Sequence, residues 1–172
     1  FNAFKLVSGS RACPRATVCE PASVAIANRF DLLQDETETI LIGSSMVRDQ
    51  GKHFSSKNAK KRTNICYPGA KIKNIVSHVN ELRIKGKQSR IITMVGSNDI
   101  FSFDKKERST EVIYKDFVAL TDSLNHKTEN AVMVGVLPRL RENNFQLSKA
   151  IGLNERVKKM FQEKGITFLV YW

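Results

Sequence analysis

The chain has 172 residues, of which 41% are hydrophobic, so it is long and apolar enough to bury one core, which argues against wholesale disorder. Its net charge of +11 favours contact with polyanions. No uncharged apolar run reaches the roughly 18 residues that span a bilayer, and Phe1 to Val7 lacks the basic and apolar regions of a signal peptide. We therefore expect an intracellular, cytoplasmic protein with no transmembrane segment.

Residues 1–36 are interpreted as a leader or linker, because they contain small polar residues and prolines and no long periodic pattern. A short amphipathic segment near 28–33 is the exception. The cysteines, Cys13, Cys19 and Cys66, have no regular spacing, which predicts reduced thiols rather than a disulfide framework. No metal and no cofactor is expected. The first and last residues, Phe1 and Trp172, suggest a fragment of a longer protein.

Residues 37–172 alternate between strand and helix patterns. We predict strands at 39–42, 62–66, 90–95, 131–137 and 166–171, each a run of apolar and β-branched residues. We predict amphipathic helices at 70–84, 110–126 and 146–163, and a shorter helix after Ser45. This alternation is typical of an α/β protein with about five parallel strands in a three-layer αβα sandwich.

The first three predicted strands end in turns that carry polar groups. These turns are Gly43-Ser44-Ser45, Pro68-Gly69-Ala70 and Gly96-Ser97-Asn98-Asp99. Because the carboxyl ends of parallel strands share one edge of the sheet, we expect the turns to gather there. A serine hydroxyl beside fixed N–H donors is what acyl transfer requires. The N–H groups of Ser45 and Gly69 and the amide of Asn98 are the expected donors.

The three turns together resemble the conserved blocks of the SGNH (GDSL-type) hydrolases. "ILIGSS" resembles the first block, "PGA" the second, and "VGSND" the third, Gly-x-Asn-Asp. The phrases "NRFDLLQDE" and "CYPGAKIKNI" are similar to esterase-like domains encoded by the first open reading frame of LINE-type retrotransposons. The resemblance covers about residues 38–172 and implies a flavodoxin-like SGNH fold, truncated at its C-terminus.

The resemblance also implies roles for single residues. Ser45 would be the nucleophile, Gly69 and Asn98 would complete the oxyanion hole, and Asp99 would brace the Asn98 loop. Two departures weaken this site. Ser44 stands where the family has aspartate, and the family's Asp-x-x-His block is absent. The three histidines, His53, His78 and His126, do not follow strands and are interpreted as helix-face or surface residues.

Three functions remain open at this point. The first is hydrolysis of an ester or acetyl group, on a small molecule, a lipid or an acetylated glycan, by the full-length parent, with this fragment inactive. The second is a non-catalytic, retrotransposon-derived module that binds RNA or a membrane surface through basic clusters. The clusters are Lys57, Lys60, Lys61 and Arg62, and then Arg83, Lys85, Lys87 and Arg90. A flavodoxin-like ligand domain is the weakest of the three, since no glycine-rich phosphate loop is present.

Other interpretations of these residues compete with the functional ones. Ser45 and Asn98 could simply cap helices, Gly69 could simply make a turn, and the basic clusters could be solvated surface. Arg139 and Arg141 follow the fourth predicted strand and could reach an anionic substrate, but a solvated loop is the simpler interpretation.

Overall fold

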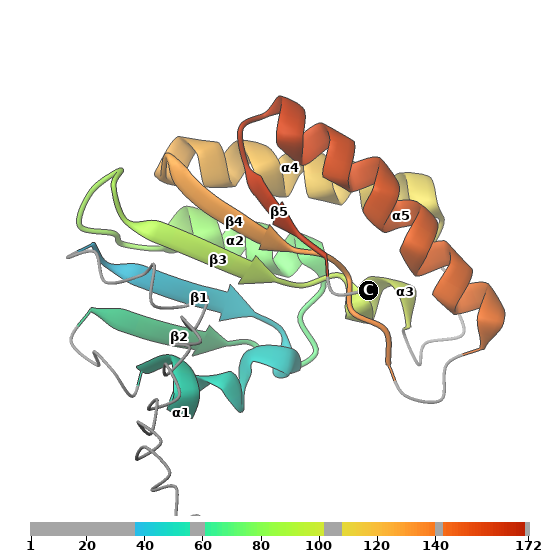
Figure 1. Ribbon diagram of the computed structural model, residues 1–172, viewed down its shortest axis with the longest axis horizontal. Coiled ribbons are helices and arrows are strands. Elements are labelled where there is room, and N and C mark those ends of the chain that lie inside the picture. The colour runs from blue at the N-terminus through green and yellow to red at the C-terminus, as the bar shows by residue number, and fades with distance from the viewer. Residues whose placement is uncertain (1–36, 56–60, 102–107, 140–142, 171–172) are drawn as a thin grey trace, which may run out of the picture. The chain divides into compact units, whose positions relative to one another are not determined.

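The computed structural model describes residues 37–55, 61–101, 108–139 and 143–170 (Figure 1). Several predictions fall outside these residues. They are the leader at 1–36 with Cys13 and Cys19, the lysines at 57 and 60, and Arg141. Among the described residues, no helix is both long and apolar enough to cross a membrane.

Five parallel strands form one sheet, as the sequence predicts. They are β1 (Thr39–Gly43), β2 (Arg62–Cys66), β3 (Arg90–Met94), β4 (Asn130–Val134) and β5 (Thr167–Leu169), in the order β2-β1-β3-β4-β5 (Figure 1). The fourth strand ends three residues before its predicted end, because Val136 bonds elsewhere. Its N–H and its carbonyl both bond to the side chain of Asn154, at 2.8 and 3.0 Å, instead of to a neighbouring strand.

The helices also follow the predicted order, with one addition. They are η2 (Ser45–Val47), α1 (Gln50–Ser55), α2 (Ile72–Glu81), α3 (Ser97–Ile100), α4 (Thr110–Lys127) and α5 (Asn144–Glu163). Helix α2 is shorter than the predicted 70–84: the Lys71 N–H bonds to Asn74 Oδ1 at its start, and Leu82 is extended at its end. Helix α3 was not predicted, because four residues are too few to show an apolar period.

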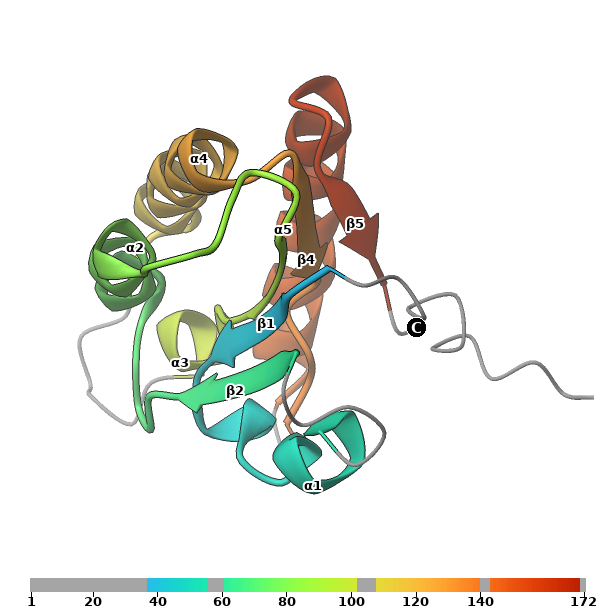
Figure 2. The ribbon, with the colours of Figure 1, turned by 90° about the vertical axis from the view of Figure 1, so that its left-hand side faces the viewer.

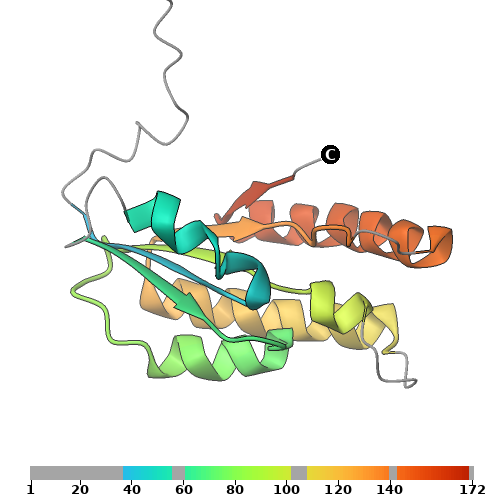
Figure 3. The ribbon, with the colours of Figure 1, turned by 90° about the horizontal axis from the view of Figure 1, so that it is seen from below.

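Right-handed crossovers divide the helices between the two faces of the sheet. From β1 the chain crosses to β2 at one side of the sheet, which places α1 on one face. From β2 it crosses back past β1 and continues in that direction through β3, β4 and β5, which places α2, α4 and α5 on the opposite face. Figures 2 and 3 show α1 on the far side of the sheet from α2 and α4. The main core lies on the face of the three longer helices, where Ile42, Ile91 and Met133 are fully buried beneath Phe117 and Phe161.

The second face of the sheet carries a thinner outer layer. Register places Leu41, Ile92 and Val132 side by side on this face. Within the described ranges, α1 is the helix that packs here, over β2, where the Arg62 guanidinium lies 5.7 Å from the Phe54 ring centre. The sandwich is therefore much thicker on one side than on the other.

Candidate active site

The turn after β1 exposes Ser45 and buries Ser44. Gly43 lets this turn approach β3: a Cβ at Gly43 would lie 2.2 Å from the Met94 carbonyl oxygen, which is backbone and cannot rotate away. The Ser44 N–H donates to that same oxygen at 3.2 Å. Ser44 is 1% exposed, whereas Ser45 is exposed at the start of η2. The hydroxyl of Ser45 is therefore accessible, as a nucleophile must be.

Ser44 does little for this turn through its side chain. Its hydroxyl makes no cap to η2. Its carbonyl oxygen accepts from Val47 N–H at 3.1 Å and from the Cys66 thiol at 3.4 Å. Ser44 therefore supports the turn through its carbonyl oxygen.

The turn after β2 is tied to the Ser45 turn through the main chain. Tyr67 N–H donates to the Gly43 carbonyl at 2.9 Å, and Ala70 N–H closes the turn on the Tyr67 carbonyl at 3.1 Å. Gly69, between them, has φ +75°, a left-handed conformation that suits glycine, and it is exposed. The sequence thus places a glycine where the chain bends beside the Ser45 turn.

The turn after β3 joins the same group through a side chain. Gly96, with φ +112°, precedes α3, and a Cβ there would lie 2.7 Å from Val136 Cγ2. The turn delivers Asn98, whose Nδ2 donates to the Ala70 carbonyl at 2.9 Å. This bond connects the turn after β3 to the residue that follows Gly69, so three turns are held together by hydrogen bonds. That is the arrangement expected from the sequence.

Asn98 has a second partner that the sequence did not reveal. Arg139, in the loop after β4, donates from Nη2 to Asn98 Oδ1 and from Nη1 to the Phe101 carbonyl at 3.0 Å. The sequence suggested only a solvated loop or a contact with an anionic substrate. Arginine lies 41 residues from Asn98 and no local pattern relates the two, so only the strand order brings them together.

Asp99 lies on the buried side of α3 and links three helices. It accepts from Ile72 N–H at 3.0 Å and from the guanidinium of Arg108, whose Nη2 also donates to Asp116 at 2.6 Å. Burial raises the pKa of the Asp99 carboxyl to about 6, while the Ile72 N–H and Arg108 oppose that rise by favouring the ionised form. Asp99 therefore makes structural contacts to α2 and α4, and Arg108 is a partner that sequence analysis missed.

The described histidines all lie on helices, as the sequence analysis expected of helix-face residues. His78 stacks on Tyr67 with ring centres 3.6 Å apart, and His126 lies in the last turn of α4, which leads to the opposite edge of the sheet. His53 is an exposed residue of α1. Within the same ranges, no group of His, Cys, Asp or Glu has the geometry of a metal site.

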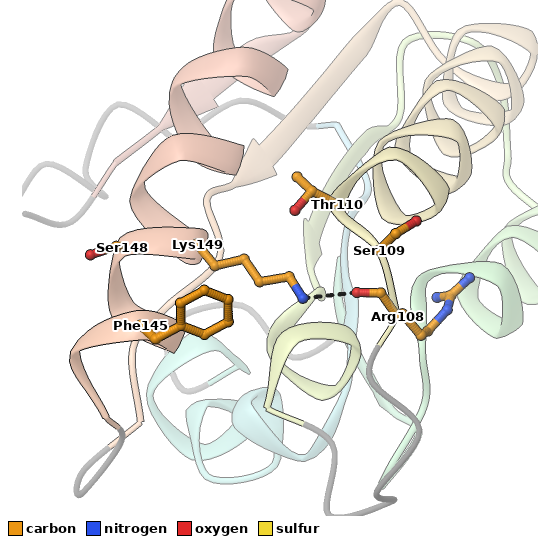
Figure 4. Close-up of a pocket in the computed structure, with 6 residues that line it drawn as sticks. All are labelled: Arg108, Ser109, Thr110, Phe145, Ser148 and Lys149. Carbon is orange, nitrogen blue, oxygen red and sulfur yellow. Dashed lines mark hydrogen bonds between the residues drawn. The ribbon is translucent and has the colours of Figure 1, made fainter.

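A cavity of about 590 Å³ opens between the N-terminal parts of α4 and α5 (Figure 4). Its lining residues are Arg108, Ser109, Thr110, Phe145, Ser148 and Lys149. The Lys149 ammonium donates to the Arg108 carbonyl at 2.8 Å, and the Arg108 guanidinium points out of the cavity (Figure 4). None of the three predicted site residues lines it.

No protein-family model and no curated protein matches the sequence. Solved structures match its fold. A member of the lipolytic protein G-D-S-L family from Veillonella parvula has a TM-score of 0.67 and 17% identity, over 79% of this chain and 78% of that one. A putative acylhydrolase from Bacteroides fragilis has a TM-score of 0.63 and 16% identity, over 88% and 79%. A catalytic mutant of an acetylxylan esterase from Geobacillus stearothermophilus has a TM-score of 0.60 and 12% identity, over 78% and 76%.

These neighbours establish the class of fold. The chain has the α/β fold of the GDSL-type (SGNH) hydrolases, as its sequence blocks predicted. At such low identity the likeness extends to the fold alone, so the roles of Ser45, Gly69 and Asn98 are argued from their own geometry.

Proposed function

We propose that the Ser45 edge is an ester-hydrolysing site in which Ser45 is the nucleophile and Gly69 and Asn98 contribute to an oxyanion hole. The observation that carries this proposal is the pair of bonds between the turns, Tyr67 N–H to Gly43 and Asn98 Nδ2 to Ala70. These bonds support the proposal because they join the turn of the exposed Ser45 to the turns that carry Gly69 and Asn98, at one edge of the sheet. Preorganised donors of this kind are the largest single contribution in many acyl-transfer sites.

The chemistry follows from the donors. The Ser45 oxygen would attack the ester carbonyl carbon, and the carbonyl oxygen would gain negative charge. The N–H groups of Ser45 and Gly69 and one Nδ2 hydrogen of Asn98 would stabilise that charge. The other Nδ2 hydrogen is already donated to Ala70, so Asn98 has one to offer.

The weak point of this site is the proton of the Ser45 hydroxyl. A serine without an adjacent base is a poor nucleophile at neutral pH, and two of the histidines are engaged elsewhere, since His78 stacks on Tyr67 and His126 lies in the last turn of α4. We therefore propose that this chain reacts slowly by itself and that an added base accelerates it. Small esters, acetyl groups on glycans and lipid esters are the proposed substrate classes.

Imidazole supplies the base in a direct test. Hydrolysis of p-nitrophenyl acetate is followed with and without imidazole, for the wild-type chain and for Ser45→Ala. The alanine variant measures the background reaction of imidazole with the ester, and Ser77→Ala, at an exposed position on α2, controls for loss of an unrelated hydroxyl. We expect an imidazole-dependent rate above background for wild type and Ser77→Ala. Equal rates for wild type and Ser45→Ala would remove Ser45 from the mechanism.

A second candidate is a non-catalytic, retrotransposon-derived module that binds RNA in the cytoplasm. The loop between α2 and β3 exposes Arg83, Lys85 and Lys87 at the sheet edge opposite Ser45. Neutralising phosphates with these side chains would make the affinity fall steeply with salt. Single-stranded RNA is titrated from low to high salt with wild type and with Arg83→Gln/Lys85→Gln/Lys87→Gln, and vesicles of anionic lipid are titrated in parallel. An RNA affinity that does not change with salt, or binding to the vesicles but not to RNA, would count against an RNA-binding function.

A further inference from the structure

The side chain of Asn98 has two ends of similar shape and opposite function. Its Nδ2 donates hydrogen bonds and its Oδ1 accepts them. An oxyanion hole needs the donor end, because an oxygen presented to a developing oxyanion would repel it. The orientation of this one amide therefore decides whether the turn after β3 stabilises or opposes negative charge. Neighbouring groups must therefore hold the Asn98 amide in one orientation.

Two contacts hold the amide in the donor orientation. Its Nδ2 faces the Ala70 carbonyl at 2.9 Å, and its Oδ1 faces the Arg139 guanidinium. Rotating the amide by 180° would set Oδ1 against the Ala70 carbonyl oxygen and Nδ2 against a cation. Both new contacts are repulsive, so each partner selects the same orientation. Arg139 contributes the stronger selection, since it is charged and the carbonyl is not.

Arg139 is itself held on three sides. Its Nη1 donates to the Phe101 carbonyl at 3.0 Å, and its guanidinium carbon lies 5.9 Å from the Phe101 ring centre. Its backbone follows Val136, which is bonded through N–H and carbonyl to Asn154 of α5. Ser97 Oγ donates to the Leu137 carbonyl at 3.0 Å and ties the same loop to α3. The guanidinium is therefore positioned from a braced loop.

The charge of Arg139 is not neutralised by the described residues. It donates to Asn98 Oδ1 and to the Phe101 carbonyl, which are both neutral, and no carboxylate among the described residues pairs with it. Arg108 differs, because it bonds two carboxylates, those of Asp99 and Asp116. A guanidinium cation on Oδ1 polarises the amide and makes its remaining Nδ2 hydrogen a better donor.

From this we propose that Arg139 is a positioning residue, which fixes and polarises the Asn98 amide for an oxyanion on its Nδ2 side. The proposal rests on the proposed function of the Ser45 edge. Arg139 need not touch the substrate; it acts through Asn98. Its removal should therefore matter only while Asn98 is present.

A double-mutant cycle tests this dependence. Wild type, Arg139→Met, Asn98→Ala and the double variant are treated with a fluorophosphonate in imidazole buffer, and the rate of Ser45 phosphonylation is measured by mass spectrometry. In this reaction the Ser45 oxygen–phosphorus bond forms, the phosphorus–fluorine bond breaks, fluoride leaves, and imidazole takes the hydroxyl proton. The phosphoryl oxygen gains charge as an ester carbonyl would.

We expect Arg139→Met to have a larger effect in the wild-type background than in the Asn98→Ala background. Arg139→Met should slow labelling about 10-fold when Asn98 is present, less than the 100-fold or more lost with a whole donor. With Asn98→Ala it should slow labelling less than about twofold. Arg139→Lys keeps the charge but cannot span both acceptors, so its rate should fall between wild type and methionine. Equal factors in both backgrounds would overturn the proposal.

A second readout does not depend on any reaction at Ser45. The side-chain amide of Asn98 gives one pair of NMR signals, which Asn98→Ala identifies by their loss. Arg139→Met should speed hydrogen exchange of this amide several-fold, with the melting temperature reporting whether the fold is intact. If no variant labels Ser45 but exchange accelerates, the proposed function fails and the positioning role stands. If exchange does not change in a folded variant, the positioning role fails.

Discussion

The turn that carries Ser45 and the turn that carries Asn98 are built in different ways. The Ser45 turn is held by backbone bonds and by a glycine packed onto β3, and the hydroxyl of Ser44 adds no cap. The Asn98 turn is held by charged side chains. Asp99 bonds to the Ile72 N–H of α2 and to Arg108, and Arg139 bonds to Asn98 Oδ1. The Asn98 turn is thus held by more side-chain bonds than the Ser45 turn.

The largest effect expected is that of Gly43→Ala, which attacks the backbone support of the Ser45 turn. The added Cβ would meet Met94 O at 2.2 Å and Val47 Cγ1 at 2.9 Å, so β1 and β3 must separate locally. We expect a loss of about 3 kcal/mol in the free energy of unfolding, measured by urea denaturation. Gly152→Ala is the matched control: it lies in α5, its Cβ would meet nothing within 4 Å, and it should stabilise slightly. Equal stability of the two variants would contradict the packing argument.

The next largest effect is expected from removing the Asp99 carboxylate, which bonds to the Ile72 N–H and to Arg108. Asp99→Ala leaves the Ile72 N–H without its acceptor and removes one of the two carboxylates on Arg108, so it should cost about 2–3 kcal/mol. Asp99→Asn keeps an acceptor and should cost less. The comparison variant is Asp122→Ala, whose carboxylate is exposed and lies 3.6 Å from Lys164; it should cost under about 0.5 kcal/mol. If Asp122→Ala lowered the free energy of unfolding as much as Asp99→Ala, the stabilising role of Asp99 would be refuted.

A smaller effect is expected from protonation and deprotonation of the Asp99 carboxyl. The pKa of Asp99 is about 6 in the folded chain, against an ordinary 3.8, so the folded state binds this proton more tightly. Its contribution to stability is complete below about pH 4 and is lost as the pH rises through 6, so the free energy of unfolding should fall over this range. Asp99→Asn should lack this component. Unfolding free energies of both proteins at pH 4, 5, 6 and 7 give the difference, and parallel curves would argue against the shift.

The smallest effect is expected at Ser44. Because its hydroxyl makes no cap, Ser44→Ala should change the unfolding free energy by under about 0.5 kcal/mol and the labelling of Ser45 by less than twofold. The result is measured beside Gly43→Ala, one residue away. A large loss at Ser44 would show that the Ser45 turn has side-chain support after all.

Sequence patterns were sufficient for the sheet and for three predicted turns, and for a physical reason. Apolar runs such as 91–94 are visible in the sequence, although only Ile91 and Thr93 are fully buried while Ile92 and Met94 are half-buried. Glycines at 43, 69 and 96 mark turns that need them. Helix α3 was missed, because four residues contain no period. Arg108 and Arg139 were missed as partners of α3, since their contacts arise from strand order and side-chain reach. Two of the contacts around Asn98 and Asp99 therefore required the folded chain.

The most direct test of the active site is to find where a reactive phosphonate attaches. The intact chain is treated with a fluorophosphonate in imidazole buffer and digested, and the labelled residue is identified by mass spectrometry. We expect Ser45 to be labelled faster than every other serine and no comparable site to appear in Ser45→Ala. Labelling of Ser45 no faster than of exposed Ser77 would contradict it.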